Sequence, residues 1–183
     1  MDVAHIAWRH RYDDTRICQR ECISLSRDGF AVSYIIPCEE QITLNEIEIV
    51  KLSCPAGKRY KKYFEVIIEI YSVSKEKDAD IYHIHEPELI PIGILLKNDG
   101  KKVIYDSHEM TRHQKWSAEI PLWQKLPETI TAVAFEKAAS YLFDGIVAAT
   151  PEIKKTFPEV KSITVTNFPK LENFESNEQT VYE

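Results

Sequence analysis

Short runs of β-branched and aromatic residues alternate along this chain with stretches in which apolar residues recur at helical spacing. Each run has the length and composition of a strand. The predicted strands are residues 3–8, 31–36, 46–50, 81–85, 102–106, 146–149 and 163–166. The predicted helices are residues 14–28, 59–73, 89–96 and 128–143, with a further one that begins at 151. Strands that alternate with helices predict an α/β fold, a Rossmann-like, doubly wound parallel sheet with helices on both faces.

The ends of several predicted helices carry recognisable signals. Asp13 or Asp14 is in position to cap the first helix, and Gly29 follows its end. Thr150 is the predicted N-cap of the helix that begins directly after it. Residues 107–127 contain two tryptophans and two prolines, which predict a long loop with a short helical turn. A long loop over the end of a sheet usually has a function.

Size and charge narrow the classes of protein. The 183 residues suit one domain over residues 1–169, followed by an acidic and polar linker or tail at 170–183. The net charge of −6 argues against nucleic acid as a partner. No apolar run is long enough to span a membrane and residues 1–20 lack a secretory signal, so the expected location is cytoplasmic. The four cysteines form no C-x-x-C pair and are expected to be reduced thiols.

Two of the predicted strands end in histidine and glutamate. His85 and Glu86 close one strand, with Glu88 just beyond them, and His108 and Glu109 close the next strand along the chain. Ligands of open parallel sheets bind outside the carboxyl ends of the strands. A histidine at such a place can act by hydrogen bonding, and a neighbouring carboxylate can orient it or a sugar hydroxyl. A capping role is the alternative for Glu109.

His83 and His85 lie two residues apart on a predicted strand and therefore share a face. With Glu86, Asp106 and His108 they could form a metal site of the histidine and carboxylate type. In the preferred alternative, His83 packs against a helix, only His85 reaches the cleft, and no metal is bound.

The turn after the first strand, residues 9–16, contains no glycine. The glycine-rich dinucleotide fingerprint and the P-loop lysine motif are absent, which excludes dinucleotide-dependent oxidoreductases and P-loop NTPases. Arg11, Thr15 and the start of the following helix still favour an anion at this edge of the sheet, as does the helix start at Thr150. A capped helix with solvated arginines is the alternative.

A basic and aromatic segment precedes one of the predicted helices. Lys58, Arg59, Lys61 and Lys62 are interleaved with tyrosines. In an acidic protein this combination favours peripheral contact with anionic lipid headgroups. A solvated basic helix end explains the same pattern.

Several segments are distinctive in combination. They are residues 13–17, 78–89, 103–109, 135–138, 145–151 and 167–169. In this order and spacing they resemble the amino-terminal domain of GT-B glycosyltransferases of family 4, and the resemblance covers nearly the whole chain.

The resemblance implies one domain of a two-domain enzyme whose Rossmann-like halves face each other across a cleft. This domain would hold the acceptor, a sugar or lipid-linked sugar, and a carboxy-terminal donor domain would hold the nucleotide-diphosphate sugar. The implied enzyme is a retaining glycosyltransferase of the hexosyltransferase type, from surface polysaccharide biosynthesis, that needs no metal or other cofactor. It would be cytoplasmic or peripheral to the inner face of the membrane. The chain by itself is expected to be inactive.

The resemblance also implies roles for individual residues. His108 would lie beside the transferred sugar, with Glu109 next to it. Arg11, Asp14 and Thr15 would face the donor diphosphate and the acceptor. Many family members have glycines in that turn, and their absence here argues against direct contact between the backbone and the diphosphate.

Acceptor contacts are expected at Glu86 and Glu88. Two other classes of function remain open. One is a stand-alone acceptor-binding or partner-binding subunit of a split glycosyltransferase. The other is a metal-dependent hydrolase that uses His83, His85 and His108.

Overall fold

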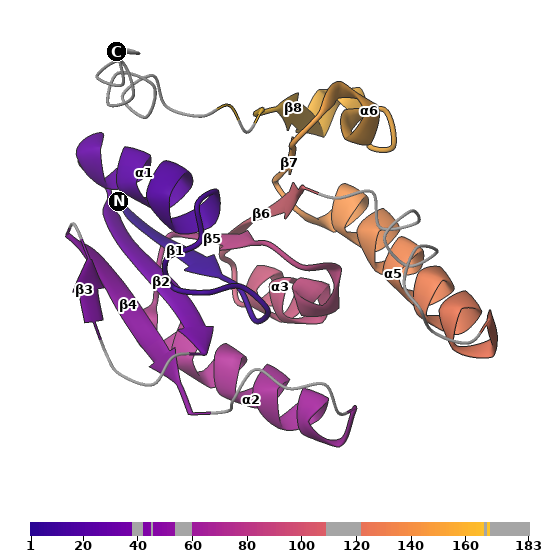
Figure 1. The fold of residues 1–183 in the computed structure, drawn as a ribbon, viewed down its shortest axis with the longest axis horizontal. Helices are drawn as coiled ribbons and strands as arrows, with labels where there is room; N and C mark the ends of the chain where they lie inside the picture. Colours follow the sequence, from indigo (N-terminus) through magenta and orange to yellow (C-terminus); the bar gives the residue numbers. More distant parts are fainter. Residues whose placement is uncertain (38–41, 45, 54–59, 109–121, 167, 169–183) are drawn as a thin grey trace, which may run out of the picture.

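A sheet of eight strands forms the centre of the described part of the molecule in a computed structural model, and helices cover both of its faces (Figure 1). The structure describes residues 1–37, 42–44, 46–53, 60–108, 122–166 and 168. The strands are β1 (Asp2–Ile6), β2 (Ala31–Pro37), β3 (Ile42–Leu44), β4 (Ile47–Leu52), β5 (Ile81–Ile84), β6 (Lys102–Ser107), β7 (Gly145–Ala148) and β8 (Ser162–Thr164).

The helical segments are of three kinds. A π-helical segment, η1 (Ile17–Cys22), leads directly into α1. Two 3₁₀ turns, η2 (Pro87–Leu89) and η3 (Glu159–Lys161), precede α3 and β8. None of the described helices is long and apolar enough to cross a membrane. The α-helices are α1 (Ile23–Arg27), α2 (Tyr60–Lys77), α3 (Ile90–Asn98), α5 (Leu122–Leu142) and α6 (Pro151–Lys154).

The order of the strands confirms the doubly wound sheet. It is β3-β4-β2-β1-β5-β6-β7-β8, and only β3 pairs in the antiparallel sense among the described strands. From β1 the chain moves outward through β2 to β4, and from β5 it moves outward in the other direction to β8. The direction therefore reverses between β1 and β5. Such a switch point is where open α/β sheets bind their ligands.

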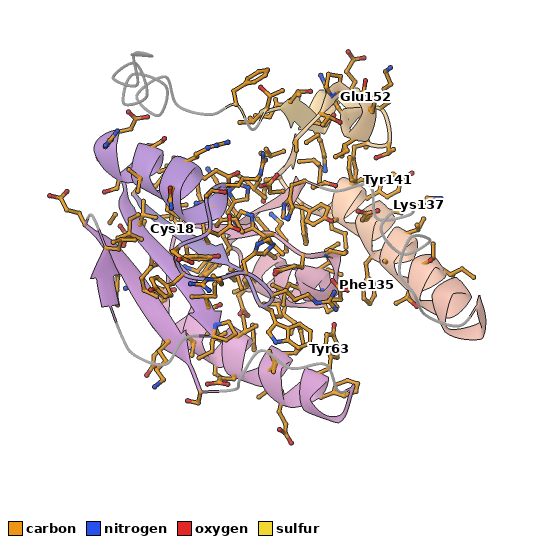
Figure 2. The ribbon with its side chains drawn as sticks, in the orientation of Figure 1. Cys18, Tyr63, Phe135, Lys137, Tyr141 and Glu152 are labelled. Atoms are coloured by element: carbon orange, nitrogen blue, oxygen red, sulfur yellow. The ribbon has the colours of Figure 1, made fainter. Side chains whose placement is uncertain are left out.

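Each face of the sheet has its own apolar core. On one face, η1 and α1 cover β1, β2 and β4, and Ile17, Cys18 and Cys22 are buried there. On the other face, α2, α3 and α5 form the cover, and Tyr63 of α2 and Phe135 of α5 pack against the buried residues. Cys18, from the first face, and Tyr63 and Phe135, from the second, are labelled in Figure 2. Helices therefore lie on both faces, as the sequence predicts.

Most of the predicted elements are present, with ends that differ by a few residues. Two differences are larger. Residues 122–127, predicted as part of a loop, form the first turns of α5. Prolines suggested a break, but a proline is tolerated in the first turn of a helix and removes one hydrogen bond further in. The strand β3 was not predicted, because alternation over three residues does not stand out from chance.

The first predicted helix differs at its start and agrees at its end. Regular helical structure begins at Ile17, three residues later than expected. Gly29 follows α1 with a φ of 87°, the left-handed conformation that glycine adopts readily after a helix. Cys18 and Cys22 are buried free thiols, as expected, whereas Cys38 and Cys54 lie outside the described residues.

Candidate functional site

A pocket of about 530 Å³ lies at the carboxyl edge of the sheet. Its walls come from the turn after β1 and from the segments that follow β6, β7 and β8. The pocket therefore occupies the edge where parallel sheets bind ligands. The polar lining residues are His10, Asp14, Thr15, Arg16, His108, Thr150 and Thr166.

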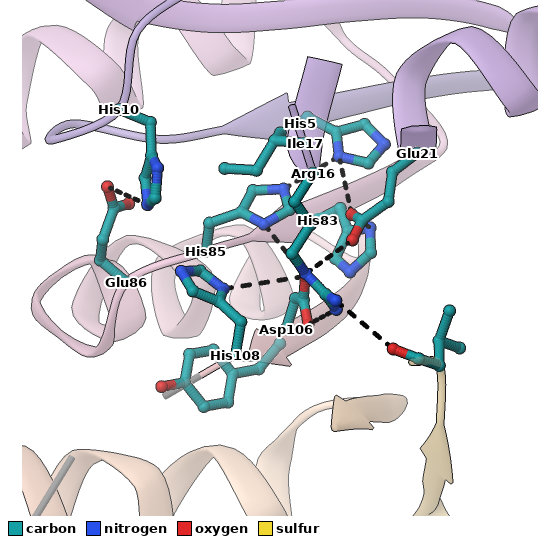
Figure 3. Close-up of polar contacts among 12 residues, drawn as sticks. His5, His10, Arg16, Ile17, Glu21, His83, His85, Glu86, Asp106 and His108 are labelled. Carbon is teal, nitrogen blue, oxygen red and sulfur yellow. Dashed lines mark hydrogen bonds and ion pairs between the residues drawn. The ribbon is translucent and has the colours of Figure 1, made fainter. Parts of the chain in front are cut away.

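Asp106, at the end of β6, organises the buried side of this pocket. Its carboxylate accepts hydrogen bonds from Arg16, with Nη2 at 2.9 Å from Oδ1 and Nε at 3.2 Å from Oδ2 (Figure 3). Burial alone would raise the pKa of Asp106, but hydrogen bonding and charge from His85 and Arg16 hold that pKa well below its usual range. The charge of Arg16 is therefore committed to an internal partner rather than left open for a ligand.

His108 lies where the pocket meets this charged group. Its Nδ1 atom is 3.9 Å from Oδ2 of Asp106, and its ring edge faces His10 with centroids 5.2 Å apart. Burial lowers the pKa of His108 to about 4, against a smaller opposing effect of Asp106. The imidazole is neutral near pH 7, so it can both donate and accept a hydrogen bond.

The Asp14 carboxylate accepts backbone hydrogen bonds at the start of η1. Its Oδ1 atom accepts the backbone N–H groups of Arg16 at 2.9 Å and Ile17 at 2.8 Å, and its Oδ2 atom lies 3.1 Å from Nδ1 of His10. The hydrogen bond with His10, followed by those with the backbone, holds the pKa of Asp14 well below its usual range although burial opposes this. An internal carboxylate thus occupies the start of η1, which favours the capped-helix alternative over an open anion site.

Arg11 and Thr15, the two candidate binding residues on either side of Asp14, lie in different surroundings in the structure. Thr15 lines the pocket, and its role in binding stays a prediction. Arg11 is not a lining residue; its guanidinium is exposed and pairs with Asp13, Nε donating to Oδ1 at 2.9 Å. The solvated-arginine alternative therefore describes Arg11.

Glu86 and Glu88 serve the turn after β1 rather than the open pocket. The buried Oε1 atom of Glu86 accepts the backbone N–H groups of Trp8 at 2.9 Å and Arg9 at 2.8 Å. Glu88 pairs with Arg9 at 3.0 Å. Glu86 holds the backbone that leads to His10 and Glu88 pairs with the Arg9 side chain, so the acceptor contacts expected from them have no direct support in the pocket lining.

Three histidines are buried beneath η1, beside the pocket. Burial lowers the pKa of His5, and it lowers that of His83 to about 3. His85 lies between two partners, with Nε2 at 2.9 Å from Nδ1 of His5 and Nδ1 at 3.3 Å from Oδ2 of Asp106. His83 and His85 share a face, as predicted. The side chain of His85 is fully buried, however, so the expectation that it reaches the cleft is wrong.

The remaining predicted residues have simpler positions. Thr150 lines the pocket and caps α6, its Oγ1 atom accepting the N–H of Ile153 at 3.3 Å. Glu109, Lys58 and Arg59 lie outside the described residues. Lys61 and Lys62 belong to α2, but their side chains are not among those described.

Sequence reasoning missed several residues of this region. His10 and Arg16 stand within the turn after β1, His5 stands in the middle of β1, Glu21 lies on η1, and Thr166 lies just beyond β8. The sequence did contain a signal for His5. Alternate residues of a strand point to the same face, so His5 shares a face of β1 with the residues two positions before and after it. Nothing local in the sequence connects Arg16 to Asp106, which is 90 residues away and meets it only across the sheet.

Comparison with known proteins gives matches only in structure. No family model matches the chain, and no curated protein matches it in sequence. Sucrose-phosphate synthase from Thermosynechococcus elongatus matches 93% of this chain with a TM-score of 0.70 and 13% identity, over 49% of its own chain. A glycosyltransferase from Rickettsia africae matches 98% with a TM-score of 0.61 and 14% identity, over 46% of its chain. UDP-N-acetylglucosamine 2-epimerase from Rickettsia bellii matches 90% with a TM-score of 0.61 and 13% identity, over 44%.

These similarities define the class of fold. The chain has the Rossmann-like α/β fold of a single domain of the GT-B glycosyltransferase type. It spans about half the length of each of the three matched chains described above. Since a glycosyltransferase and an epimerase share this fold, the fold alone does not select the reaction.

Proposed function

We propose that this chain is the acceptor-side domain of a retaining glycosyltransferase that uses a nucleotide-sugar donor in surface polysaccharide biosynthesis. One observation carries the proposal: His108 lines a pocket at the carboxyl edge of a GT-B-type sheet and is neutral there. A neutral imidazole suits contact with sugar hydroxyls, for which a charged group is not needed.

The pocket offers further groups of the same chemistry. Thr15 and Thr150, which both carry hydroxyls, line the same pocket as His108. Hydrogen-bonding groups on rigid strand ends position an acceptor, and positioning supplies much of the rate in a transfer between two bound substrates. Arg16 pairs with Asp106, so we infer that groups outside this pocket stabilise the leaving diphosphate.

A second domain is part of this proposal. The exposed apolar side chains of Ile163, Val165 and Phe168 lie at and just beyond β8, and Phe168 also lines the pocket. Such a cluster beside a site suits a partner surface. That partner is a donor domain of the same polypeptide or, in the alternative, a separate subunit of a split glycosyltransferase.

Membrane contact and location are part of the same proposal. A cytoplasmic enzyme that acts on a lipid-linked acceptor would benefit from peripheral attachment, and Lys58, Arg59, Lys61 and Lys62 supply the charge for it. Binding to vesicles with and without anionic lipid, before and after exchange of these four residues for glutamine, tests this part by itself.

The central experiment uses the complete protein that the gene encodes, with a separate partner subunit if the reading frame ends at Glu183. Transfer from a panel of nucleotide sugars is measured for the wild type, for His108→Ala and for the exposed control Lys75→Ala. We expect His108→Ala to lower turnover about 100-fold while circular dichroism stays unchanged, and Lys75→Ala to retain full activity. Turnover of His108→Ala equal to that of the wild type would remove His108 from the mechanism.

A further inference from the structure

The cluster of buried imidazoles brings together residues that are far apart in the sequence. His5 of β1 and His83 of β5 are register partners on adjacent strands, and His85 follows on the same face. Glu21 descends from η1 onto this group (Figure 3). Three elements, separated in the sequence by up to 80 residues, thus present four metal-ligating side chains to one point.

The distances between ligand atoms are close to those of a metal site. The four residues offer one ligand atom each, and these atoms all lie within 4.8 Å of one another. Oε2 of Glu21 is 4.0 Å from Nδ1 of both His5 and His83, and Nδ1 of His5 is 2.9 Å from Nε2 of His85. Ligands about 2.0–2.1 Å from a tetrahedral zinc ion are about 3.3 Å apart. Small rotations of these four side chains would therefore bring their ligand atoms to the distances of a tetrahedral site.

Several polar atoms of the cluster have no hydrogen-bond partner within the described residues. They include Nε2 of His5, Nε2 of His83 and both carboxyl oxygens of Glu21. Arg16 is close to Glu21, with Nε at 3.1 Å from Oε1, but Oε2 is left toward the imidazoles. Buried polar groups are normally paired, and each unpaired one costs about 1–3 kcal/mol. An ion between Oε2 of Glu21 and the Nδ1 atoms of His5 and His83 would supply the partner that this oxygen lacks among the described residues.

Asp106 provides the support that a histidine ligand normally has. Its Oδ2 atom lies 3.3 Å from Nδ1 of His85, on the opposite side of the ring from His5. Metal-bound histidines commonly donate their second ring N–H to a carboxylate, which fixes the tautomer and leaves the first nitrogen free for the ion. The Asp106 carboxylate therefore lies close enough to His85 for this hydrogen bond, and a rotation of the ring is needed to align it.

Protons occupy this cluster where an ion would bind. Arg16 pairs with Asp106 and also lies close to Glu21. Burial and the charge of Asp106 raise the pKa of Glu21 to about 9, so this carboxyl is protonated in the absence of an ion. The short contact between His5 and His85 likewise needs a proton between two nitrogens. A metal ion would replace both protons, because metal ligands bind in their deprotonated form.

We propose that His5, Glu21, His83 and His85 bind one divalent transition-metal ion of the zinc type. Three nitrogens and one carboxylate oxygen are ligands that suit zinc, cobalt or nickel, whereas calcium and magnesium prefer oxygen alone. The site differs from the set expected for a metal-dependent hydrolase, because His108 is replaced by His5 and Glu21. It also revises the expectation that this chain binds no metal.

The ion has a structural role rather than a catalytic one. The exposed fractions of His5, His83 and His85 are 0%, 8% and 2%, which leaves no room for a substrate beside the metal. The ion ties η1 to β1 and β5 at the switch point of the sheet, and η1 follows directly on the pocket residues Thr15 and Arg16. The proposal does not depend on glycosyl transfer and holds whatever reaction the pocket supports.

The test begins with metal content and thermal stability of the purified, tag-free chain. Elemental analysis after growth in zinc-supplemented medium is expected to give about one ion per chain. Chelator-treated protein that then receives zinc is expected to unfold about 5–10 °C higher, the effect of a ligand at roughly a hundred times its dissociation constant. Cobalt in place of zinc is expected to give the intense visible absorption of a four-coordinate site.

Variants locate the ion. Glu21→Gln keeps the shape of a partly exposed side chain and His83→Gln removes a ring nitrogen, and both are expected to lose the ion, the shift and the absorption. His10→Gln, a histidine outside the cluster, is expected to keep all three. Wild-type protein that contains no ion and gains no stability from zinc overturns the proposal. So does zinc binding that persists at full stoichiometry in Glu21→Gln.

Discussion

The two faces of β1 and β5 are built on different physical principles, although alternate residues of the same strands supply both. On one face, Ile6 and Ile84 are buried in a continuous apolar core beneath α2, α3 and α5. On the other, His5 and His83 are buried beside charged groups under η1. The first face depends on shape and volume. The second depends on how its charged and hydrogen-bonding groups are paired.

This difference explains where chemistry can arise in the fold. An apolar core tolerates exchange of similar volumes but offers no reactive groups. A buried polar network gives fixed geometry and shifted pKa values, and removal of one member leaves its partners uncompensated. Arg16 and His108 line the pocket and also contact Asp106 of the polar face. The buried charged group therefore fixes the positions of these two pocket residues.

The largest effect is expected on the polar face. Asp106→Asn leaves the buried charge of Arg16 without its main partner, and we expect the free energy of unfolding to fall by about 3–5 kcal/mol. Urea denaturation followed by circular dichroism measures it. The double variant Arg16→Met, Asp106→Leu is the control, and it is expected to recover part of the loss because both charges leave together, while Glu21 and His85 still lose a partner. A loss below about 1 kcal/mol for Asp106→Asn would show that the pair behaves like a surface ion pair.

A smaller effect is expected on the apolar face, from a change in volume alone. A Cβ atom at Gly93 of α3 would approach Phe143, and would lie 2.6 Å from Cδ1 of Ile84. Gly93→Ala is expected to lower the free energy of unfolding by about 1–3 kcal/mol, through overpacking that outweighs the better helix propensity of alanine. Gly100→Ala is not a suitable control because its φ is 82°, so the double variant Gly93→Ala, Phe143→Leu is used. It should lose less than the sum of the two single variants, whereas simple additivity would contradict the close approach.

A third effect, at the rim of the polar face, depends on pH. The pKa of His108 is about 4 in the folded chain, below its ordinary value of 6.5, so the unfolded chain binds more protons between these values. Stability due to this group is therefore complete above pH 6.5 and is lost as the pH falls toward 4. His108→Asn is expected to reduce the slope of unfolding free energy against pH in that window by up to about 1.4 kcal/mol per pH unit. Chelator-treated protein is used for all of these measurements. An unchanged slope would mean that the pKa of His108 is not lowered by burial and that its imidazole is solvated.

The fold was predictable because its signals are local. The strands around His83 and Tyr105 are short apolar runs, each followed by a helical pattern or a turn, and that order determines a doubly wound sheet. The start of α5 was not predictable from breaker residues, since Pro127 lies in the second turn of α5, where a proline removes one helical hydrogen bond, and the helix nevertheless continues. Element order is thus more secure than element ends.

The site was predictable only in part, because its contacts cross the sheet. His108, Thr15 and Thr150 stand at strand ends, and their position at one edge follows from parallel topology. The pairing of Arg16 with Asp106 depends on the order of strands, which sequence patterns leave open. That order also turns Glu86 toward a backbone turn rather than toward the pocket.

The smallest expected effect separates capping from binding at Thr150. Its Oγ1 atom accepts the N–H of Ile153, so Thr150→Ala is expected to lower the free energy of unfolding by about 0.5–1 kcal/mol, and Thr150→Ser by much less. Thermal unfolding of the chain measures this loss. Under the proposed function, Thr150→Ala in the complete protein is also expected to raise KM for the acceptor, because Thr150 lines the pocket. A stability loss with unchanged KM would mean that Thr150 only caps α6 and that the binding groups of the pocket lie nearer His108.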